Sequence, residues 1–298
     1  MRISKNHYVY SLDQAHEPAA QVDLPCRLTF ETFDCFQAQV KQASDTLDTV
    51  DFTHINPATG PVYFNQLKPG DVLKVNIRDI RCQSPGVMMV APGMGVMGDV
   101  IKQSATVLVP VSGNHITLFG FSLPARPMIG VIGLAPASEG IPTGTPGSHG
   151  GNMDTNLISA GTSIYFPVQV EGGLLAMGDL HALMGDGEIC GTGVEVNGEV
   201  DVTVERAFGL TIDNPLLVTP DLVCTIYSDL DLDIAVKGAT ANMTNLITQY
   251  SDLDLSQATM LMSICGNAQI SQVVDPAMTA RFTMPRTIMK QLGVAVAF

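Results

Sequence analysis

Charged residues are scarce in this chain of 298 residues. Asp, Glu, Lys and Arg together make up 15% of it, whereas hydrophobic residues make up 46%. This balance excludes the charge-rich, apolar-poor composition of disordered proteins, so we expect the chain to fold. So little charge also leaves apolar surface for another subunit to cover. We therefore expect a homo-oligomer, a dimer or larger.

Basic residues are the scarcer kind of charge, with 15 Lys and Arg against 29 Asp and Glu and a formal net charge of −14. The sequence contains no cluster of Lys and Arg with interleaved aromatic residues. A negatively charged protein without such a cluster repels a phosphate backbone, which argues against nucleic acid as a partner.

Long hydrophobic runs are also absent. No stretch of about 18 apolar residues occurs, and the N-terminal residues lack the apolar segment of a secretory signal. From these absences, and from cysteines that form no C-x-x-C pair, we expect a cytoplasmic protein with reduced thiols and no membrane partner. The six dispersed cysteines are Cys26, Cys35, Cys82, Cys190, Cys224 and Cys265.

Several catalytic motifs are missing as well. The chain has no G-x-S-x-G sequence and no Walker A sequence, and the Gly-rich "PGMGVMGD" of residues 92–99 is not followed by a helical pattern. These absences argue against a serine hydrolase and against nucleotide or dinucleotide binding.

What the sequence has instead is a series of short β-like runs. Residues 27–36 alternate apolar and polar side chains, and residues 60–82 indicate a strand, a Pro-Gly-Asp turn and a second strand. Asn197 and Gly198 lie between two alternating runs and predict a β-hairpin. This spacing predicts antiparallel sheets in a sandwich-like or barrel-like arrangement.

Two of these runs share a layout that an internal duplication would explain. Tyr63 precedes Gly70 at the same interval as Tyr165 precedes Gly172, although two unrelated hairpins with similar turns would give the same spacing. The length fits a single unit spanning residues 1–298. The alternative is a division into an N-terminal β half, residues 1–145, and a half that carries the motifs, residues 146–298.

Helical spacing appears only late in the chain. It occurs in residues 233–250, 256–269 and 284–293, with Ser256 as the expected N-cap of the second helix. Strands and helices do not alternate along the chain, so an all-parallel α/β sheet is excluded. We expect antiparallel sheets with short helices near the C-terminus.

Two Gly-rich polar segments carry the candidate site. The first is "HGGNMD", residues 149–154, which places an imidazole, an amide and a carboxylate in a loop with little side-chain bulk. The second is "GDLHALMGDGEICG", residues 178–191. In it, Asp179 and His181 are two residues apart and would share one face of an extended strand. Asp186 and Glu188 repeat that spacing.

Together these segments offer ligands for a metal. Imidazole and carboxylate ligands are typical of a hydrolytic Zn²⁺ site, because they hold a borderline cation and leave a position for water. Ca²⁺ would prefer carboxylate and amide oxygens alone. We expect a divalent metal, zinc with calcium as the alternative. The candidate ligands are Asp154, Asp179, His181 and Glu188.

The same segments supply candidates for substrate binding and for the chemistry. Glycine lets the backbone come close to a ligand. The candidate substrate-binding residues are Asn152, Gly150 and Gly151, and the candidate catalytic residues are Glu188, His149 and Asp186.

Each of these assignments has a structural alternative. Residues 185–188 alone would indicate a surface turn, and His149 would serve equally well as a loop cap. Cys190, close to His181, is either a nucleophile or, more commonly, an inert buried thiol.

Four segments resemble the acetamidase/formamidase family. They cover residues 56–75, 149–154, 178–195 and 268–286 and occur in the expected order. The resemblance implies a mainly β fold with smaller α/β portions, associated metal ions that include zinc and calcium, and hydrolysis of small amide substrates such as formamide and acetamide. Leu180 departs from the family pattern, which commonly has a small residue there, and the apolar residues 182–184 are a second departure. Both bear on pocket shape.

The ligands and the resemblance combine into a hypothesis. A bound divalent metal lowers the pKa of a water far below that of bulk water, toward about 7, and the resulting hydroxide attacks the amide carbonyl. Glu188 is the first choice to protonate the departing nitrogen, with His149 as the second. Three alternatives stay open: a hydrolase of another C–N bond, a non-catalytic Ca²⁺-binding β-protein, which has no use for the imidazole of His181, and an oligomeric scaffold with solvated acidic turns.

Overall fold

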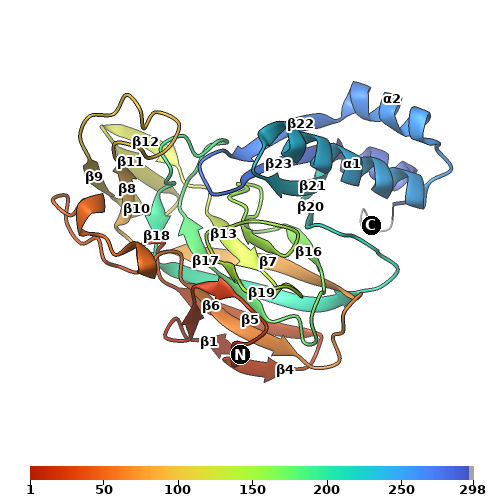
Figure 1. Ribbon diagram of the computed structural model, residues 1–298, viewed down its shortest axis with the longest axis horizontal. Helices are drawn as coiled ribbons and strands as arrows, with labels where there is room; N and C mark the ends of the chain where they lie inside the picture. The colour runs from red at the N-terminus through yellow and green to blue at the C-terminus, as the bar shows by residue number, and fades with distance from the viewer. Residues whose placement is uncertain (295–298) are drawn as a thin grey trace.

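The protein is described here by a computed structural model that covers residues 1–294, and it contains two large β-sheets of nine strands each that pack around one core. Figure 1 shows these sheets in the middle of the molecule, with the helices gathered at the upper right. The protein is mostly strand with few helices, as expected. Over the described residues neither sheet closes into a barrel, so the sandwich-like arrangement is the one found.

The first sheet is antiparallel apart from the parallel pair of β1 and β5 at its edge. The predicted alternation is clear in β19, where Val200, Val202 and Val204 are buried and Thr203 between them is half-buried. In spatial order the strands are β1 (Arg2–Ile3), β5 (Cys26–Thr32), β19 (Gly198–Ala207), β7 (Val72–Cys82), β16 (Ser163–Pro167), β20 (Leu216–Val218), β21 (Leu222–Asp229), β23 (Met278–Pro285) and β22 (Asn267–Gln272).

The second sheet has two central strands, β13 and β17, that are buried along their whole length. Polar residues on these strands are therefore held away from bulk water. Its main path is β15 (Gly150–Asn152), β13 (Met128–Gly133), β17 (Leu175–His181), β18 (Glu195–Val196), β8 (Gly86–Val90) and β9 (Ala105–Val109). Pairing with β17 also adds β6 (Ala58–Phe64), which in turn pairs with β2 (Tyr8–Val9) and β4 (Ala20–Val22).

Smaller elements surround the two sheets. The first group is a three-stranded sheet of β10 (Val111–Ser112), β11 (His115–Leu118) and β12 (Phe121–Pro124), and the second is a pair formed by β3 (Ser11–Leu12) and β14 (Ile141–Pro142). The connection between β5 and β6 contains two 3₁₀ helices, η1 (Leu47–Thr49) and η2 (Phe52–His54).

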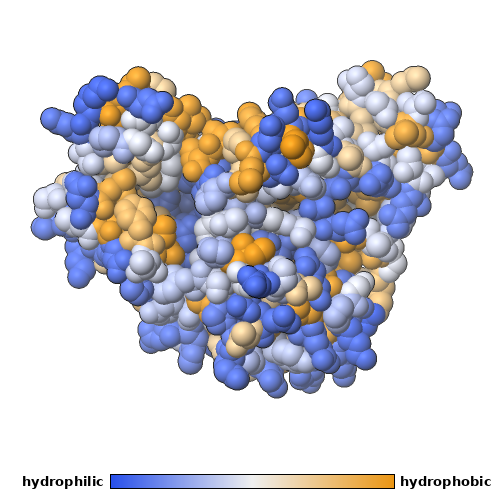
Figure 2. Space-filling model, in the orientation of Figure 1, coloured by the Kyte–Doolittle hydropathy of each residue, from blue (hydrophilic) through white to orange (hydrophobic). Residues whose placement is uncertain are grey.

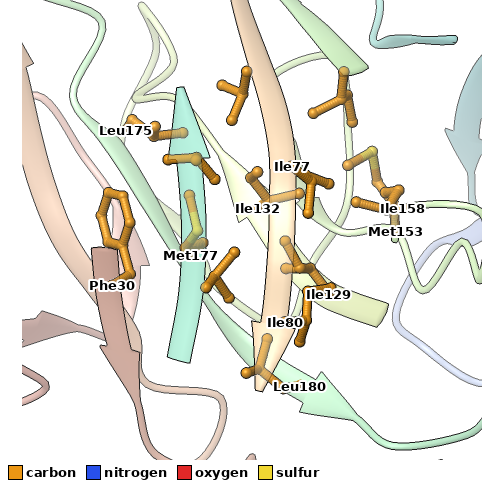
Figure 3. Packing of buried hydrophobic residues seen from close by; sticks show 14 of the residues in the cluster. Phe30, Ile77, Ile80, Ile129, Ile132, Met153, Ile158, Leu175, Met177 and Leu180 are labelled. Carbon is orange, nitrogen blue, oxygen red and sulfur yellow. The ribbon is translucent and has the colours of Figure 1, made fainter. Parts of the chain in front are cut away.

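The core lies between the two sheets (Figure 3). Met177 and Leu180 of β17 both belong to it, although they are three positions apart and a regular strand would point them to opposite faces. Asp179 between them has a φ of 55°, which interrupts the extended conformation. The interruption lets Leu180 face the core while Asp179 and His181 point away from it.

The two segments with matching sequence spacing form matching structures. In each, a strand of one sheet is followed by a turn and by a strand of the other sheet: β6 leads to β7, and β16 leads to β17. The pairs then associate reciprocally, because β6 pairs with β17 and β7 pairs with β16, both antiparallel. The shared spacing therefore corresponds to a shared structural unit, although neither unit is a simple hairpin.

The hairpin predicted at Asn197 is wrong. β18 before it belongs to the second sheet and β19 after it belongs to the first, so the chain crosses between sheets at this point. The side chain of Asn197 is used in the crossing, since its Nδ2 donates to Asp34 Oδ2 at 3.0 Å and its Oδ1 accepts from the backbone N–H of Asp34 at 3.2 Å.

The C-terminal helices cover the end of the first sheet. The helices are α1 (Leu232–Tyr250), α2 (Leu255–Cys265) and α3 (Arg286–Gln291), and α1 packs on β21 and β23. The prediction of Ser256 as an N-cap is wrong. Asp254 caps α2 in a reciprocal pair with Gln257, which satisfies two backbone N–H groups where a lone serine hydroxyl would satisfy one.

Strands from both sides of residue 145 take part in both large sheets; in the second sheet β13 pairs directly with β15.

Within residues 1–294, no helix combines the length and the apolar character needed to cross a membrane.

Candidate active site

The candidate site begins at the end of β17, where Asp179 and His181 lie side by side. Both side chains are buried, and His181 Nε2 lies 3.4 Å from Asp179 Oδ1. As expected, the two side chains share one face. The left-handed backbone of Asp179 produces this arrangement, and not the alternation of a regular strand.

Two further carboxylates surround the same imidazole nitrogen. Glu195 Oε2 lies 3.1 Å from His181 Nε2, and Asp154 Oδ1 lies 3.8 Å from it. Glu195 is directly opposite His181 in the pairing of β18 with β17, and Asp154 follows β15. The sequence does not single out Glu195, because the Asn-Gly pair that begins two residues later predicts a hairpin, and Glu195 then reads as an ordinary strand residue.

Glu188 and Cys35 complete the cluster. Asp154, His181 and Glu188 each offer a ligand atom, and these atoms lie within 4.8 Å of one another; the same holds for Cys35, Asp179 and Glu195. Three of the acidic residues have left-handed backbones, with φ of 39° at Asp154, 55° at Asp179 and 49° at Glu188. Such strain costs about 1–3 kcal/mol per residue and persists mainly at functional sites.

Gly130 makes room for the cluster. A Cβ at this position of β13 would lie 2.4 Å from Asp179 Oδ2 and 2.5 Å from Asp154 Oδ1. Any side chain would therefore displace both carboxylates. No local pattern indicates this role, since Gly130 lies in an apolar run and reaches the acidic residues only through the pairing of three strands.

Burial and mutual repulsion raise the pKa values of the acidic residues, and the single imidazole of His181 offsets this only in part. Burial, followed by the nearby Asp179 carboxylate, raises the pKa of Asp154 to about 7 and that of Glu195 to about 8. Burial, followed by Asp154, also raises the pKa of Glu188 and of Asp275 well above the ordinary range. The cluster thus favours a bound cation, be it a proton or a metal.

The imidazole and the thiol respond to the same surroundings. Burial lowers the pKa of His181, but Glu195 and Asp179 outweigh that effect and hold it well above its usual value. Burial, followed by the Glu195 carboxylate, raises the pKa of the Cys35 thiol well above 9, the usual value for cysteine. A thiol so hard to ionise is a poor nucleophile.

The donor set fits a divalent metal. Both carboxylate oxygens of Asp154, Asp179 Oδ1 and Glu195 Oε2 are buried and have no hydrogen-bond partner. Two ligands of a tetrahedral zinc, each about 2.1 Å from the ion, lie about 3.4 Å apart. The distances of 3.1 to 3.8 Å from His181 Nε2 to its three carboxylate neighbours bracket that separation.

A cavity of about 410 Å³ opens onto the cluster. Asp179, Glu188 and Glu195 line it, together with Asn152 and Asp275. Asn152 Nδ2 donates to Asp275 Oδ2 at 3.0 Å, whereas Asn152 Oδ1 is buried without a partner. The candidate substrate-binding amide is thus in the cavity, and Asp275, which follows β22, is a second residue that sequence reasoning missed.

His149, Gly150 and Gly151 do not line the cavity. The buried imidazole of His149 lies inside its own loop, where a Cβ at Gly151 would come within 3.2 Å of its Nε2. Burial lowers the pKa of His149 to about 4. Gly150 and Gly151 have φ of 99° and 83° and pack against neighbouring backbone, so they serve the loop's path.

Asp186 also lies outside the cavity, and its carboxylate is paired. Arg281 Nη2 donates to Asp186 Oδ2 at 2.7 Å, and Asn156 Nδ2 donates to Asp186 Oδ1 at 2.8 Å. The backbone N–H of Gly187 donates to Ser271 at 2.8 Å. These contacts fasten the turn that carries Glu188 to the C-terminal part of the first sheet.

Two features singled out in the sequence do not reach the cavity. Leu180 is fully buried in the core, and residues 182–184 are not among the lining residues, so neither departure from the family pattern lies in the cavity wall. Cys190 is likewise not a lining residue, and its thiol donates to the Thr192 carbonyl at 3.4 Å.

Comparison with known proteins places the chain in a family. The sequence profile described as "Acetamidase/Formamidase family" matches residues 13–143 and 137–291. A crystal structure of an acetamidase from Bacillus halodurans is 41% identical, covering 99% of this chain and 100% of that one, with a TM-score of 0.97. A crystal structure of a recombinant predicted acetamidase/formamidase from Thermoanaerobacter tengcongensis is 45% identical, with 98% of each chain covered and a TM-score of 0.96.

The similarity to curated sequences is shorter. A formamidase from Methylophilus methylotrophus is 32% identical over 178 residues, which is 51% of this chain and 43% of that protein. The match therefore spans less than half the length of that relative.

Proposed function

Because this chain belongs to the acetamidase/formamidase family, we propose that it hydrolyses short aliphatic amides to the carboxylate and ammonia in a metal-dependent reaction. The observation that carries the proposal is the buried cluster of carboxylates around His181 that opens onto a cavity. Buried acidic residues that outnumber their one imidazole partner are costly to the fold, and such arrangements concentrate at functional sites.

Asp154, Asp179 and His181 are the residues that would hold the cation, with Glu195 against the same imidazole nitrogen. A divalent cation there supplies Lewis acidity, which activates water at neutral pH and polarises the amide carbonyl. The imidazole and carboxylate donors favour zinc, and a site of oxygens alone would favour calcium.

Glu188 moves the proton in this scheme. Its side chain lines the cavity and also contacts the cluster, whereas Asp154 and His181 are not lining residues. A carboxylate oxygen of Glu188 takes a proton from the water that attacks the carbonyl carbon. As the C–N bond breaks, the same oxygen returns the proton to the nitrogen, which leaves as ammonia.

Asn152 orients the amide. Its Nδ2 is occupied by Asp275, which fixes the side chain and leaves the unpartnered Oδ1 as an acceptor in the cavity wall. An N–H of the substrate amide would donate to it. Once a substrate fills the site, this contact satisfies a buried acceptor that otherwise has no partner.

The test is ammonia release from formamide, acetamide and propionamide, together with ring opening of a cyclic amide followed by its amino-acid product, before and after chelation and with Zn²⁺ and Ca²⁺ returned separately. The proposal predicts ammonia release from the linear amides that stops on chelation and recovers with one ion. Ring opening of the cyclic amide without ammonia from the linear amides would favour a hydrolase of another C–N bond. Binding of Ca²⁺ without any ammonia would favour a non-catalytic protein.

A further inference from the structure

The cavity has two unlike walls. One is the acidic cluster, and the other is apolar, formed by Phe36, Leu47, Phe52, Ile55 and Met94. Four of these residues come from the connection between β5 and β6, and Met94 comes from the loop after β8. The apolar wall is close to the reacting centre, because Cys35, next to Phe36, offers its thiol beside Asp179 and Glu195.

The apolar wall is part of a packed unit. Phe36 is buried in a small hydrophobic cluster with Val87 and Met89 of β8, and Leu47 and Ile55 pack against that cluster. The loop that carries Met94 is fastened as well, since the backbone N–H of Val96 donates to the Ile189 carbonyl at 2.8 Å. Figure 2 shows apolar surface on the left of the molecule, where Figure 1 draws this connection in orange.

No Lys, Arg or His lines the cavity among residues 1–294, whereas four carboxylic acids do: Asp179, Glu188, Glu195 and Asp275. A substrate that carries its own carboxylate would meet like charges and find no basic partner. Anionic substrates are therefore disfavoured at this site, and the apolar wall offers no partner for a charged group of either sign.

The cavity is also too large for the smallest amides. At about 30 Å³ for each water-sized group, the three heavy atoms of formamide fill roughly a fifth of its 410 Å³. Cavities from about 300 Å³ upward are those that proteins use for larger organic ligands.

We infer that the preferred substrates are uncharged primary amides whose acyl group is an apolar chain longer than acetyl, and that Leu47, Phe52 and Met94 hold this chain. The inference rests on the proposed function, because it assumes that amide hydrolysis takes place at the acidic wall. It adds the class of acyl group, which the acidic wall alone does not specify.

The experiment measures kcat/KM for acetamide, butyramide and hexanamide with the metal-loaded enzyme. Each buried methylene contributes about a three- to fourfold gain, so we expect an increase of roughly 100-fold from acetamide to hexanamide. Succinamate, which places a carboxylate where butyramide has a methyl group, should react at least about tenfold more slowly than butyramide.

Two variants locate the chain-binding wall. Met94→Ala should lower the ratio of hexanamide to acetamide kcat/KM by about tenfold, because hexanamide reaches this wall and acetamide does not. Met97→Ala is the matched control: it lies in the same loop, is 51% exposed and does not line the cavity. Its ratio should equal that of the wild type.

The possible failures can be told apart. An enzyme that releases ammonia from formamide and acetamide but loses kcat/KM as the chain lengthens would overturn the inference and leave the proposed function standing. An unchanged ratio in Met94→Ala would overturn the assignment of this wall. A folded, metal-loaded protein that releases no ammonia from any of these amides would overturn the proposed function and the inference with it.

Discussion

Two groups of acidic residues in this protein have opposite surroundings. On the outer face of the first sheet, Arg81 Nη2 lies 2.9 Å from Glu199 Oε2, and Arg27 Nη2 lies 2.6 Å from Asp201 Oδ2. Hydrogen bonds from Thr29 and then Arg27 lower the pKa of Asp201. In the candidate site, three carboxylates surround one imidazole, and Glu188 and Asp275 lie in the same cavity. Burial raises the pKa values of Asp154, Glu188, Glu195 and Asp275.

The difference shows which acidic residues serve the fold. A carboxylate that meets an arginine at the surface stabilises the chain a little, whereas buried carboxylates without such partners lower its stability. The second arrangement persists only where something else uses it. We therefore expect substitutions in the two groups to differ in size and even in sign.

The largest effect is expected within one short turn. Its Glu188 belongs to the buried carboxylates of the candidate site, whereas its Asp186 is paired with Arg281. Glu188→Gln should lower kcat about 10²- to 10⁴-fold, because the amide cannot transfer the proton. Asp186→Asn loses part of its pairing with Arg281 and should keep kcat within about threefold. Steady-state ammonia release measures both. Full kcat in a metal-loaded Glu188→Gln enzyme would remove Glu188 from the mechanism.

A smaller but still large effect should follow Gly130→Ala. The added methyl group displaces the Asp154 and Asp179 carboxylates, so metal affinity should fall about 10- to 100-fold. Gly185→Ala is the matched control, because a Cβ there meets nothing within 4 Å. Competition with a chromophoric chelator measures the affinities. Equal affinities in the two variants would show that the carboxylates need not keep their positions.

The sign of a stability change separates the two groups most sharply. In metal-free protein, Asp154→Asn removes a buried carboxylate whose oxygens have no hydrogen-bond partner and should raise the free energy of unfolding by about 1–3 kcal/mol. Asp201→Asn removes bonds from Arg27 and Thr29 and should lower it by about 1 kcal/mol. Urea unfolding at neutral pH gives both values, and a loss of stability in each variant would contradict the comparison.

The smallest effect concerns His149, which is buried but belongs to neither group. Its folded pKa of about 4 lies below the unfolded value of about 6.5, so the unfolded state binds more protons between these pH values and stability falls as the pH is lowered. From pH 7 to pH 5 the imidazole should account for about 2 kcal/mol. His149→Asn should lose that part of the slope in urea unfolding. An identical slope would show that this imidazole takes up its proton without unfolding.

The β-rich fold and the position of the site were predictable because local patterns determine them. Alternation gave strands such as β19, and the polar residues within Gly-rich segments marked Asp179, His181, Glu188 and Asp154. The resemblance to the family added the class of reaction. These signals all lie within short stretches of sequence.

What could not be predicted depends on pairing between distant strands. Glu195 joins the cluster because β18 pairs with β17, and Gly130 matters because β13 lies on the other side of β17. The same limit explains the misplaced hairpin at Asn197, since its side chain bonds to Asp34 in a segment far away in sequence. Nor did residue type separate Asp186 from Glu188, because the partner of Asp186 is Arg281, on β23.

The most direct test of the central claim is the zinc content of the folded protein after loading with Zn²⁺ and dialysis, measured by mass spectrometry of the metal. The account predicts about one retained ion per chain in the wild type and in His115→Ala, whose imidazole is exposed on β11, and little or none in His181→Ala. No retained metal in the folded wild type, or equal retention in His181→Ala, would contradict it.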